Sequence, residues 1–322
     1  MKILVTGGAG YVGSVLVPIL LSAGHTLRVY DSLNYGGASL LSVWSDPAFE
    51  FRRADIRDRR AVRSALSGME AVIHLAGVVG DPACARDPQL ARAVNLQASL
   101  AFIEDSQRAG VERFVFASTC SNYGKMKDAN HYVDEESELR PVSLYAETKV
   151  AVEKSLLASG NGKAWSPTPL RFATIFGASP RMRFDLTVNE FTLEMLVKKR
   201  LVVFGEQFWR PYLHVRDAAR AIKLVLESPA TKVAGRVFNV GATHQNFQKQ
   251  QLIELIRPHA PDAVVEFVHK TEDPRDYRVS FSRIREQLGF QITRTVTEGI
   301  AEVARLVREN VINDFENRSY RN

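Results

Sequence analysis

The sequence predicts an α/β fold built on a doubly wound parallel sheet, followed by a smaller mixed α/β lobe. A strand, a glycine-rich loop and a helix open the chain, and strands and helices then alternate as far as residue 176. Such alternation requires parallel strands with right-handed crossovers and helices on both faces. After Gly177 this regular alternation of strands and helices ends. With 322 residues, of which 45% are hydrophobic, the chain can bury a large core.

The first strand ends in a loop that is typical of nucleotide binding. An apolar run at 3–5 leads into Gly7, Gly10 and Gly13. Glycines at this spacing allow a tight turn, the close approach of a diphosphate and tight packing of the next helix, whose N-terminus favours negative charge. The pattern predicts a Rossmann-type dinucleotide site at these glycines.

Asp31 closes the second predicted strand, 26–30. A carboxylate in this place can accept hydrogen bonds from both hydroxyls of an adenosine ribose and would repel a 2′-phosphate, so it favours NAD over NADP. The alternative is that Asp31 is a simple turn residue before Ser32.

Further elements follow in order. Asp55 either contacts an adenine amino group or caps the helix that follows it. We expect helices at 12–23, from after the acidic turn 54–58 to about 67, at 88–108 and at 143–158. We expect strands at 71–75, 113–118 and 169–175.

The second half of the chain is less regular. A basic loop at 181–185 precedes shorter predicted segments at 189–199, 201–204, 217–227, 237–240, 250–257 and 264–268. We therefore assign residues 1–176 to a cofactor-binding domain, to which some later segments return, and residues 177–322 mainly to a substrate-binding lobe.

Tyr145 and Lys149 are the strongest catalytic candidates. They are four residues apart on a helix that begins at Ser143, so their side chains share a face. A lysine ammonium favours the phenolate and lowers the pKa of the tyrosine, which can then take a proton from a hydroxyl. Tyr123 and Lys127 have the same spacing, but in a loop. Thr119 offers a hydroxyl to hold the reacting oxygen, or is an ordinary loop residue.

Composition excludes several other classes of function. The net charge is +6, but the basic clusters lack interleaved aromatic residues, which argues against nucleic-acid binding. Cys84 and Cys120 have neither CxxC nor zinc spacing, and the seven histidines show no metal-like spacing, so we expect no metal. Met1 leads directly into a strand and no apolar stretch is long enough to span a bilayer, so we expect a cytoplasmic protein without a membrane partner.

Taken together and in order, these motifs resemble the extended short-chain dehydrogenases/reductases, specifically the NAD-dependent nucleotide-sugar epimerase/dehydratase family. The resemblance is carried by the glycine loop, Asp31, Asp55-Ile56, His74-Leu75-Ala76-Gly77, Asn95, Ser118-Thr119, Tyr123-Gly124, Tyr145-x-x-x-Lys149 and Pro169-Leu170-Arg171.

The resemblance implies NAD as cofactor and a nucleoside diphosphate sugar as substrate. It implies an active centre of Thr119, Tyr145 and Lys149. The implied NAD contacts are Gly7, Gly10, Tyr11, Val12, Gly13, Asp31, Asp55, Ile56, Leu75, Ala76, Gly77, Asn95, Tyr145 and Lys149. The implied substrate contacts are Thr119, Thr174, Asn189, Phe204, Arg210 and Arg275 or Arg278. A homodimer through helices near 90–107 and 144–158 is also implied.

Three departures from the family pattern bear on the reaction. The sugar 4,6-dehydratases and related decarboxylases carry an acid just past the Ser/Thr, where this chain has Cys120-Ser121, and this argues against dehydration. Some galactose epimerases have a lysine where this chain has Val79, and many members have Asn where it has Thr174. We interpret Cys120 as a packed loop thiol.

The sequence therefore favours an NAD-dependent nucleotide-sugar epimerase, with 4-epimerisation through a transient keto-sugar. The alternative is a nucleotide 4-ketosugar reductase. A dehydratase or a non-catalytic dinucleotide-sensing protein fits the residues less well, because a sensor has no need of the Tyr145 and Lys149 pair.

Overall fold

The computed structural model describes residues 1–126, 131–160, 165–270 and 275–322. Its centre is a seven-stranded parallel sheet with the strand order β10-β6-β5-β4-β1-β2-β3. The predicted doubly wound α/β fold is confirmed. The strands of this sheet are β1 (Lys2–Thr6), β2 (Thr26–Asp31), β3 (Phe49–Arg53), β4 (Ala71–His74), β5 (Arg113–Thr119), β6 (Ser166–Phe172) and β10 (Phe238–Val240).

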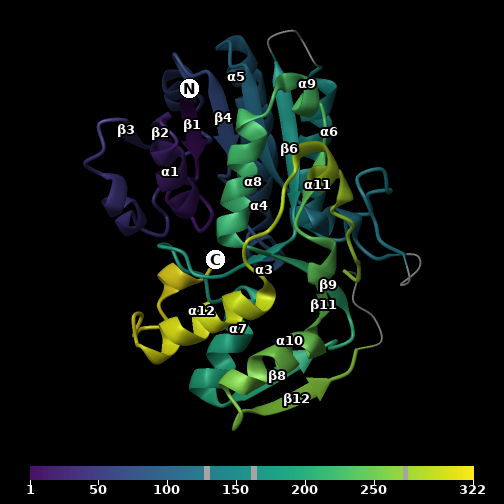
Figure 1. Cartoon of the computed structure of the whole chain (residues 1–322). Coiled ribbons are helices and arrows are strands. Elements are labelled where there is room, and N and C mark those ends of the chain that lie inside the picture. Colours follow the sequence, from purple (N-terminus) through teal and green to yellow (C-terminus); the bar gives the residue numbers. More distant parts are fainter. Residues whose placement is uncertain (127–130, 161–164, 271–274) are drawn as a thin grey trace.

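Helices cover both faces of the sheet (Figure 1). On one face α1 (Gly13–Ser22) and α8 (Val215–Glu227) bury their apolar sides against residues such as Ile3 and Val5. On the other, α2 (Arg59–Leu66), α5 (Ser99–Arg108) and α6 (Leu144–Ala158) pack around Leu4 and Val72. Successive β1 side chains therefore point into two different cores, as a central strand of a parallel sheet requires.

Short helices connect these layers. They are η1 (Ala38–Val43), α3 (Asp81–Arg86), α4 (Pro88–Ala91), η3 (Cys120–Tyr123), α9 (Ala230–Val233) and α11 (Ser282–Leu288). The helix predicted at 88–108 exists but is not uniform, because a π-helical segment, η2 (Arg92–Ala98), lies between α4 and α5. A π turn inserts one extra residue into a helix and is frequent at functional sites.

The strand predicted at 169–175 is in fact two strands, and our prediction is wrong at its end. β6 stops at Phe172, and Ala173 still bonds to the β10 residue Val240. β7 (Thr174–Phe176) then pairs with β9 (Trp209–His214) in a second sheet. The sequence hid this change because β6 is buried throughout and the apolar Ile175 and Phe176 of β7 follow it closely.

The second lobe is built mainly from segments after β6 (Figure 1). The predicted segments at 217–227 and 237–240 correspond to α8 and β10, which belong to the first sheet, so the chain crosses between the lobes repeatedly. The other elements are α7 (Thr187–Leu193), η4 (Glu194–Lys198), β8 (Arg200–Phe204), η5 (Thr243–Gln245), β11 (Asn246–Gln248), α10 (Lys249–Ile256), η6 (Arg257–His259), β12 (Val264–Val268), α12 (Val296–Arg308) and η7 (Arg318–Tyr320).

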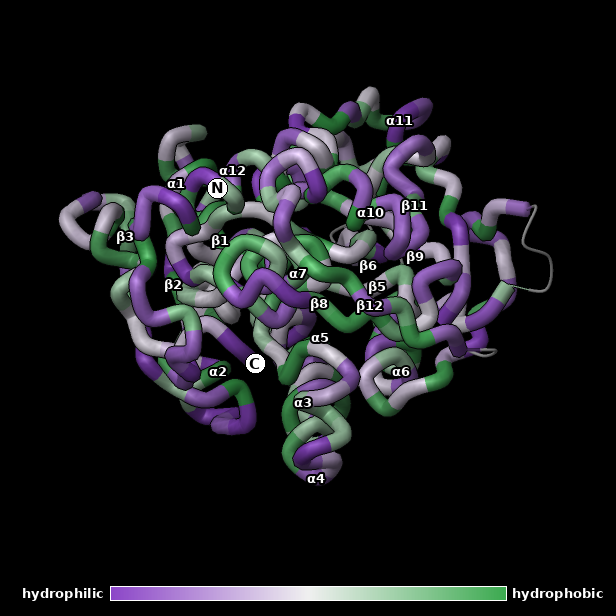
Figure 2. Tube along the Cα trace, turned by 90° about the horizontal axis from the view of Figure 1, so that it is seen from below, coloured by the Kyte–Doolittle hydropathy of each residue, from purple (hydrophilic) through white to green (hydrophobic). Residues whose placement is uncertain are grey.

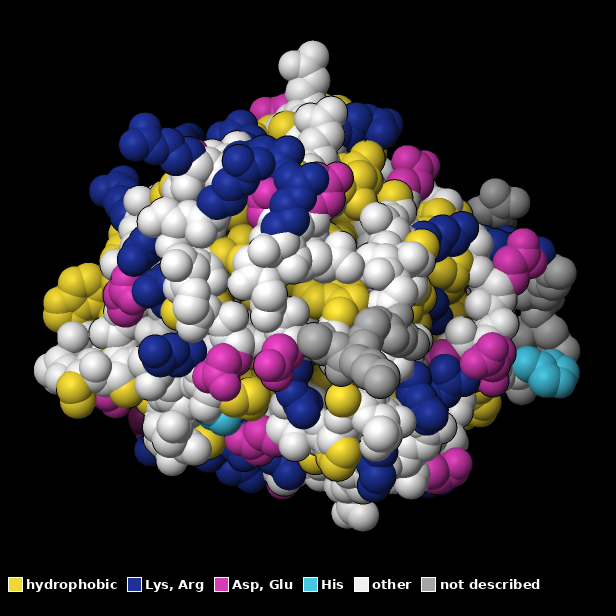
Figure 3. All heavy atoms as spheres, turned by 90° about the horizontal axis from the view of Figure 1, so that it is seen from above, with side chains coloured by type: hydrophobic (Ala, Val, Ile, Leu, Met, Phe, Trp, Pro, Cys, Tyr) yellow, Lys and Arg dark blue, Asp and Glu magenta, His cyan; other side chains and the backbone are white. Residues whose placement is uncertain are grey.

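Polar character is distributed over the surface. Hydrophilic segments are frequent along the outer rim of the trace (Figure 2), and on the face seen from above Lys and Arg are interspersed with Asp and Glu (Figure 3). Among the residues that the structure describes, no helix is both long and apolar enough to cross a membrane.

Candidate functional site

The glycine loop between β1 and α1 has no room for a side chain at Gly7 or Gly13. A Cβ on Gly13 would lie 2.4 Å from the carbonyl oxygen of Gly7, and one on Gly7 would lie 2.8 Å from the amide nitrogen of Ala76. Gly7 also has a φ of 73°, which favours glycine. Gly10 turns the loop by donating its N–H to Gly7. The backbone can therefore pass close to a diphosphate at the start of α1, as a dinucleotide site requires.

Asp31 ends β2 beside this loop. Its carboxylate accepts the backbone N–H of Ala9 at 3.0 Å and of Leu33 at 2.8 Å, and the side chain stays partly exposed. Burial raises the pKa of Asp31, and these two bonds counteract it. A carboxylate fixed in this way, next to the glycine loop, fits the ribose end of a dinucleotide.

Asp55 does not cap the helix that follows it. Its carboxylate pairs with Arg57 at 2.7 Å, while Asp58 caps α2 through the N–H groups of Arg60 and Ala61. The capping alternative was therefore wrong, because the helix begins three residues later than that interpretation needs. An adenine contact of Asp55 and an NAD contact of its buried neighbour Ile56 stay predictions.

The loop after β4 carries Leu75, Ala76 and Gly77, and Asn95 from η2 holds it. The Asn95 side chain accepts the N–H of Val78 at 2.7 Å and donates to the carbonyl of Val78 at 2.8 Å. This two-point contact fixes the backbone at the ligand-binding end of the sheet. His74 is packed: it bonds Thr6 and Ser99, and burial with the charge of Lys149 lowers its pKa to about 3.

Thr119, Tyr145 and Lys149 lie at the same end of the sheet. Thr119 is the last residue of β5, and Ser143 caps α6 so that Tyr145 and Lys149 project from its first two turns. The Lys149 Nζ donates to the carbonyl of Ala117 at 2.9 Å and lies 5.9 Å from the centre of the Tyr145 ring. The Tyr145 and Lys149 side chains are thus neighbours, and the bond of Lys149 to Ala117 connects α6 to β5.

The pKa of Tyr145 moves in the direction opposite to our prediction. Burial raises it, and the nearby Cys84 and Asp81 add to this effect, whereas Arg183 counteracts it. The ammonium of Lys149, which donates to the carbonyl of Ala117, does not outweigh this burial. Burial in turn lowers the pKa of Lys149 to about 8.

The residues predicted to bind the diphosphate are only partly brought together. Arg210 lies over the ring of Tyr277 at 5.3 Å, and both Arg210 and Arg275 act electrostatically on the Tyr277 hydroxyl. Arg278 instead stacks on Tyr132 and on Trp209 of β9, 4.2 and 4.6 Å from their ring centres. Arg275 therefore shares the surroundings of Tyr277 with Arg210, whereas Arg278 does not, and the diphosphate contacts of these arginines stay predictions.

Three further predicted substrate residues occupy different settings. Thr174 is partly exposed on β7, and Phe204 is 50% exposed at the end of β8. Asn189 is fully buried: it accepts the N–H of Gly177 and donates to the carbonyl of Arg183 at 2.9 Å each. Its amide also donates to the hydroxyl of Tyr11 at 3.1 Å. Asn189 thus holds the loop that covers the start of α1, and its predicted diphosphate contact would require these bonds to break.

Cys120 and Tyr123 are structural in this geometry. Cys120 is 1% exposed, and burial raises its pKa well above the usual value, which agrees with a packed thiol. The Tyr123 hydroxyl donates to Asn239 at 2.7 Å and accepts from Arg171 at 2.8 Å. Lys127, its partner in spacing, lies outside the described residues.

Sequence reasoning missed Asp81, Ser121 and Tyr277. The Ser121 and Tyr277 hydroxyls are 3.3 Å apart. The negative charge of Asp81 contributes to the raised pKa of Tyr145. One signal was available for Asp81, since it follows the predicted strand 71–75 at the ligand-binding end of the sheet. Tyr277 gave no such signal, because its segment has no periodic pattern.

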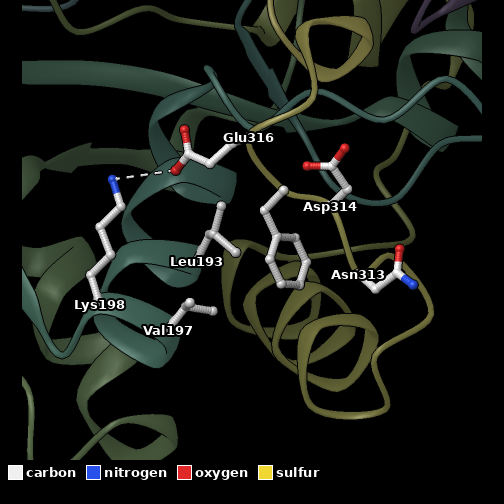
Figure 4. A pocket seen from close by; sticks show the side chains of 7 residues that line it. Leu193, Val197, Lys198, Asn313, Asp314 and Glu316 are labelled. Atoms are coloured by element: carbon white, nitrogen blue, oxygen red, sulfur yellow. Dashed lines mark ion pairs between the residues drawn. The ribbon is translucent and has the colours of Figure 1, made fainter.

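Two hollows lie away from these residues. One, of about 220 Å³, lies where Leu193, Val197 and Lys198 face the segment 313–316 (Figure 4). The other, of about 410 Å³, lies between 241–244 and 290–295. Neither is lined by a predicted site residue. Among the described residues, no group of three or more His, Cys, Asp or Glu side chains is arranged to hold a metal ion.

This arrangement agrees with a known family. Residues 3–241 match the model of the NAD dependent epimerase/dehydratase family. The chain belongs to this family. The fit of the glycine loop and Asp31 to a dinucleotide is thereby explained, and NAD is the cofactor of the family.

Relatives of two activities are similar to the chain along nearly its full length. A UDP-glucose 4-epimerase of Corynebacterium glutamicum is 27% identical, covering 94% of each chain. A dTDP-glucose 4,6-dehydratase of an Actinoplanes species is 30% identical, covering 96% of this chain and 98% of its own. The solved UDP-glucose 4-epimerase of Thermus thermophilus in complex with NAD has a TM-score of 0.83 and 26% identity, covering 96% of this chain and all of its own.

Proposed function

We propose that the protein is an NAD-dependent nucleotide-sugar epimerase that inverts a single carbon, C4, through a transient keto-sugar. The observation that carries this proposal is the pairing of Tyr145 and Lys149 with a Thr119 that no acid follows. The next two side chains are the buried thiol of Cys120 and the hydroxyl of Ser121. Elimination of water from the sugar would need a further acid and base in this place.

Tyr145 acts as the base and then as the acid. Its phenolate takes the proton of the sugar hydroxyl while the hydride leaves the same carbon, and this gives the ketone. NAD, when bound, would supply the hydride acceptor and donor. For inversion the sugar would turn so that its other face meets the hydride donor, and Tyr145 gives its proton back to the oxygen. Thr119 holds that oxygen beside Tyr145.

Lys149 and the arginines have supporting roles. Burial raises the pKa of Tyr145, and the ammonium of Lys149 on the same helix face is proposed to offset part of that cost when the phenolate forms. Arg210 and Arg275 hold the diphosphate, so the nucleotide stays bound while the sugar turns. Binding energy far from the reacting carbon thereby retains the intermediate. The base of the nucleotide is proposed to contact Phe204.

Because the chain is similar to both epimerases and dehydratases, the test must distinguish epimerisation from dehydration. The protein with NAD is incubated with UDP-, dTDP-, GDP- and CDP-hexoses, and the products are identified by NMR. We expect a C4 epimer, no net NADH and, in deuterated water, no deuterium on carbon. A 4-keto-6-deoxy product would show dehydration instead and overturn the proposal.

A 4-ketosugar reductase is the second candidate, because the same Tyr145 and Lys149 would serve it. It differs in stoichiometry, since each turnover consumes one reduced cofactor. Incubation of a nucleotide 4-ketosugar with NADH distinguishes the two functions: stoichiometric oxidation of NADH favours the reductase, and catalytic use of NAD favours the epimerase.

The preference for NAD over NADP is proposed to rest on Asp31. Asp31→Ala is expected to weaken NAD binding about tenfold, the effect of losing charge-assisted hydrogen bonds. Calorimetric titration of both dinucleotides measures this. Unchanged NAD affinity in the variant, or NADP bound as tightly as NAD by the wild type, would refute the assignment.

A further inference from the structure

Asp81 joins the two lobes at the candidate active site. It follows Gly80, whose φ of 97° makes a sharp turn after β4, and it is the first residue of α3. One carboxylate oxygen accepts the hydroxyl of Ser143 at 2.7 Å. The other accepts the Nη1 of Arg275 at 2.6 Å, from a residue 194 positions away. The Asp81 side chain is 23% exposed, so both bonds are partly shielded from water.

The bond to Ser143 reaches the helix that carries the catalytic pair. Ser143 caps α6, because its Oγ accepts the backbone N–H of Ala146 at 3.3 Å. A hydroxyl has one hydrogen to donate, and here it goes to Asp81. Its lone pairs therefore point to the helix, and Asp81 orients the cap that precedes Tyr145.

The bond to Arg275 reaches the proposed diphosphate position. Arg210 lies over the ring of Tyr277 at 5.3 Å, and the charge of Arg275, two residues before Tyr277, also acts on that hydroxyl. A long side chain loses rotamer freedom when it binds a ligand, and a carboxylate that already holds one nitrogen reduces this cost. A guanidinium carries five N–H donors, so the bond of Arg275 to Asp81 does not by itself exclude a bond to a phosphate.

We propose that Asp81 is a positioning residue that holds Arg275 ready for the substrate diphosphate and ties it to the cap of the helix bearing Tyr145. This inference rests on the proposed function. Asp81 is not a second proton donor, because both of its oxygens already accept hydrogen bonds from Ser143 and Arg275. The argument against dehydration is therefore unchanged by a carboxylate at this place.

A double-mutant cycle tests the proposal. UDP, dTDP, GDP and CDP are each titrated calorimetrically into the NAD-loaded full chain of the wild type, and the nucleotide that binds most tightly is then titrated into Asp81→Asn, Arg275→Ala and the double variant. Asparagine keeps an oxygen for Ser143 but loses the charge for Arg275. We expect Asp81→Asn to weaken binding of the better nucleotide about tenfold, and to have less than a twofold effect in the Arg275→Ala background.

Two controls separate positioning from general damage. Glu309→Gln removes the carboxylate of an exposed pair with Arg305 that is remote from the site, and should change nothing. Ser143→Ala loses the cap but keeps the pair between Asp81 and Arg275, so its effect on nucleotide affinity should be smaller than that of Asp81→Asn.

The outcomes are distinct. If Asp81→Asn binds the nucleotide as tightly as the wild type, or more tightly, Asp81 does not prepare Arg275 and the inference fails. Equal effects of Asp81→Asn in both backgrounds also overturn it, because Asp81 would then act without Arg275. If the wild type binds neither UDP, dTDP, GDP nor CDP, the proposed function fails, and this inference fails with it.

Discussion

Tyr145 shows how burial and charge compete at a single residue. The sequence places Lys149 one helical turn away, and from this spacing we expected a lowered pKa of the phenol. The structure adds what spacing does not contain: the Tyr145 side chain is partly buried and the Lys149 ammonium is bonded to Ala117, so burial outweighs the charge. The identity of the pair could be predicted from sequence, but the direction of the pKa shift required the packing.

Replacement of Tyr145 separates catalysis from stability. Tyr145→Phe removes the only proposed base, and turnover should fall about 100-fold or more while bound NAD is retained. Tyr123→Phe should change turnover far less, but it leaves Asn239 and Arg171 without their hydroxyl partner. It should therefore lower the free energy of unfolding by about 1–3 kcal/mol. Steady-state kinetics and urea unfolding measure the two effects. Normal turnover of Tyr145→Phe would exclude the mechanism.

Lys149 makes the stability depend on pH. Its pKa is about 8 in the folded protein, against 10.5 for an ordinary lysine. Between these values the unfolded chain binds more protons than the folded protein, so the burial cost is relieved as pH rises and the free energy of unfolding increases. Lys149→Met lacks this group. Urea unfolding at pH 7.5 and pH 10 should show the wild type gaining stability relative to the variant. A difference independent of pH would contradict the assigned burial.

At the scale of the element, periodicity predicted where helices lie but not how they are interrupted. The helix at 88–108 has the expected extent, yet η2 within it is π-helical. Hydrophobic spacing averages over several turns, so one extra residue leaves little trace in it. The interruption matters because η2 carries Asn95, whose amide holds both backbone groups of Val78. Similarly, the end of β6 at Phe172 was not visible, because Ala173, Ile175 and Phe176 continue the mainly apolar segment.

Asn95→Ala tests the function of this segment. Without the amide, the N–H and carbonyl of Val78 lose their partners, and the loop after β4 loses its attachment to η2. We expect a loss of about 1–3 kcal/mol in the free energy of unfolding and faster hydrogen exchange at Val78. Gln97→Ala, an exposed position of the same segment, is the matched control and should leave exchange unchanged. Equal exchange at Val78 in both variants would show that Asn95 does not hold the loop.

At the scale of the molecule, the order of motifs was sufficient to predict the family and the doubly wound sheet. The glycine loop, Asp31 and the alternation of strands and helices are local signals that all agree. The site between the lobes could be predicted only in part. Asp81 and Arg275 meet across 194 positions of sequence, and no local pattern encodes such a contact. The arginines were found by resemblance, whereas their partners emerged only from the packing.

The first sheet depends on segments that follow residue 176 in the sequence. The seven-stranded sheet is completed by β10 and covered by α8, although both follow residue 176. Ile222, Val225 and Leu226 of α8 and Phe238 and Val240 of β10 are each at most 1% exposed. Burial of each such side chain contributes about 1.5–3 kcal/mol, so their combined loss is comparable with the roughly 5–15 kcal/mol that stabilises a whole domain.

A fragment of residues 1–176 should therefore fail to fold, although it contains every predicted NAD contact. We expect no cooperative thermal transition by circular dichroism and no NAD binding by calorimetry, with the full chain as the reference for both. Its β5 and β6 would expose the apolar face that α8 covers, and β6 would become an unpaired edge strand, so the fragment should also aggregate. A fragment that melts cooperatively and binds NAD with the affinity of the full chain would show that the first 176 residues form an independent domain after all.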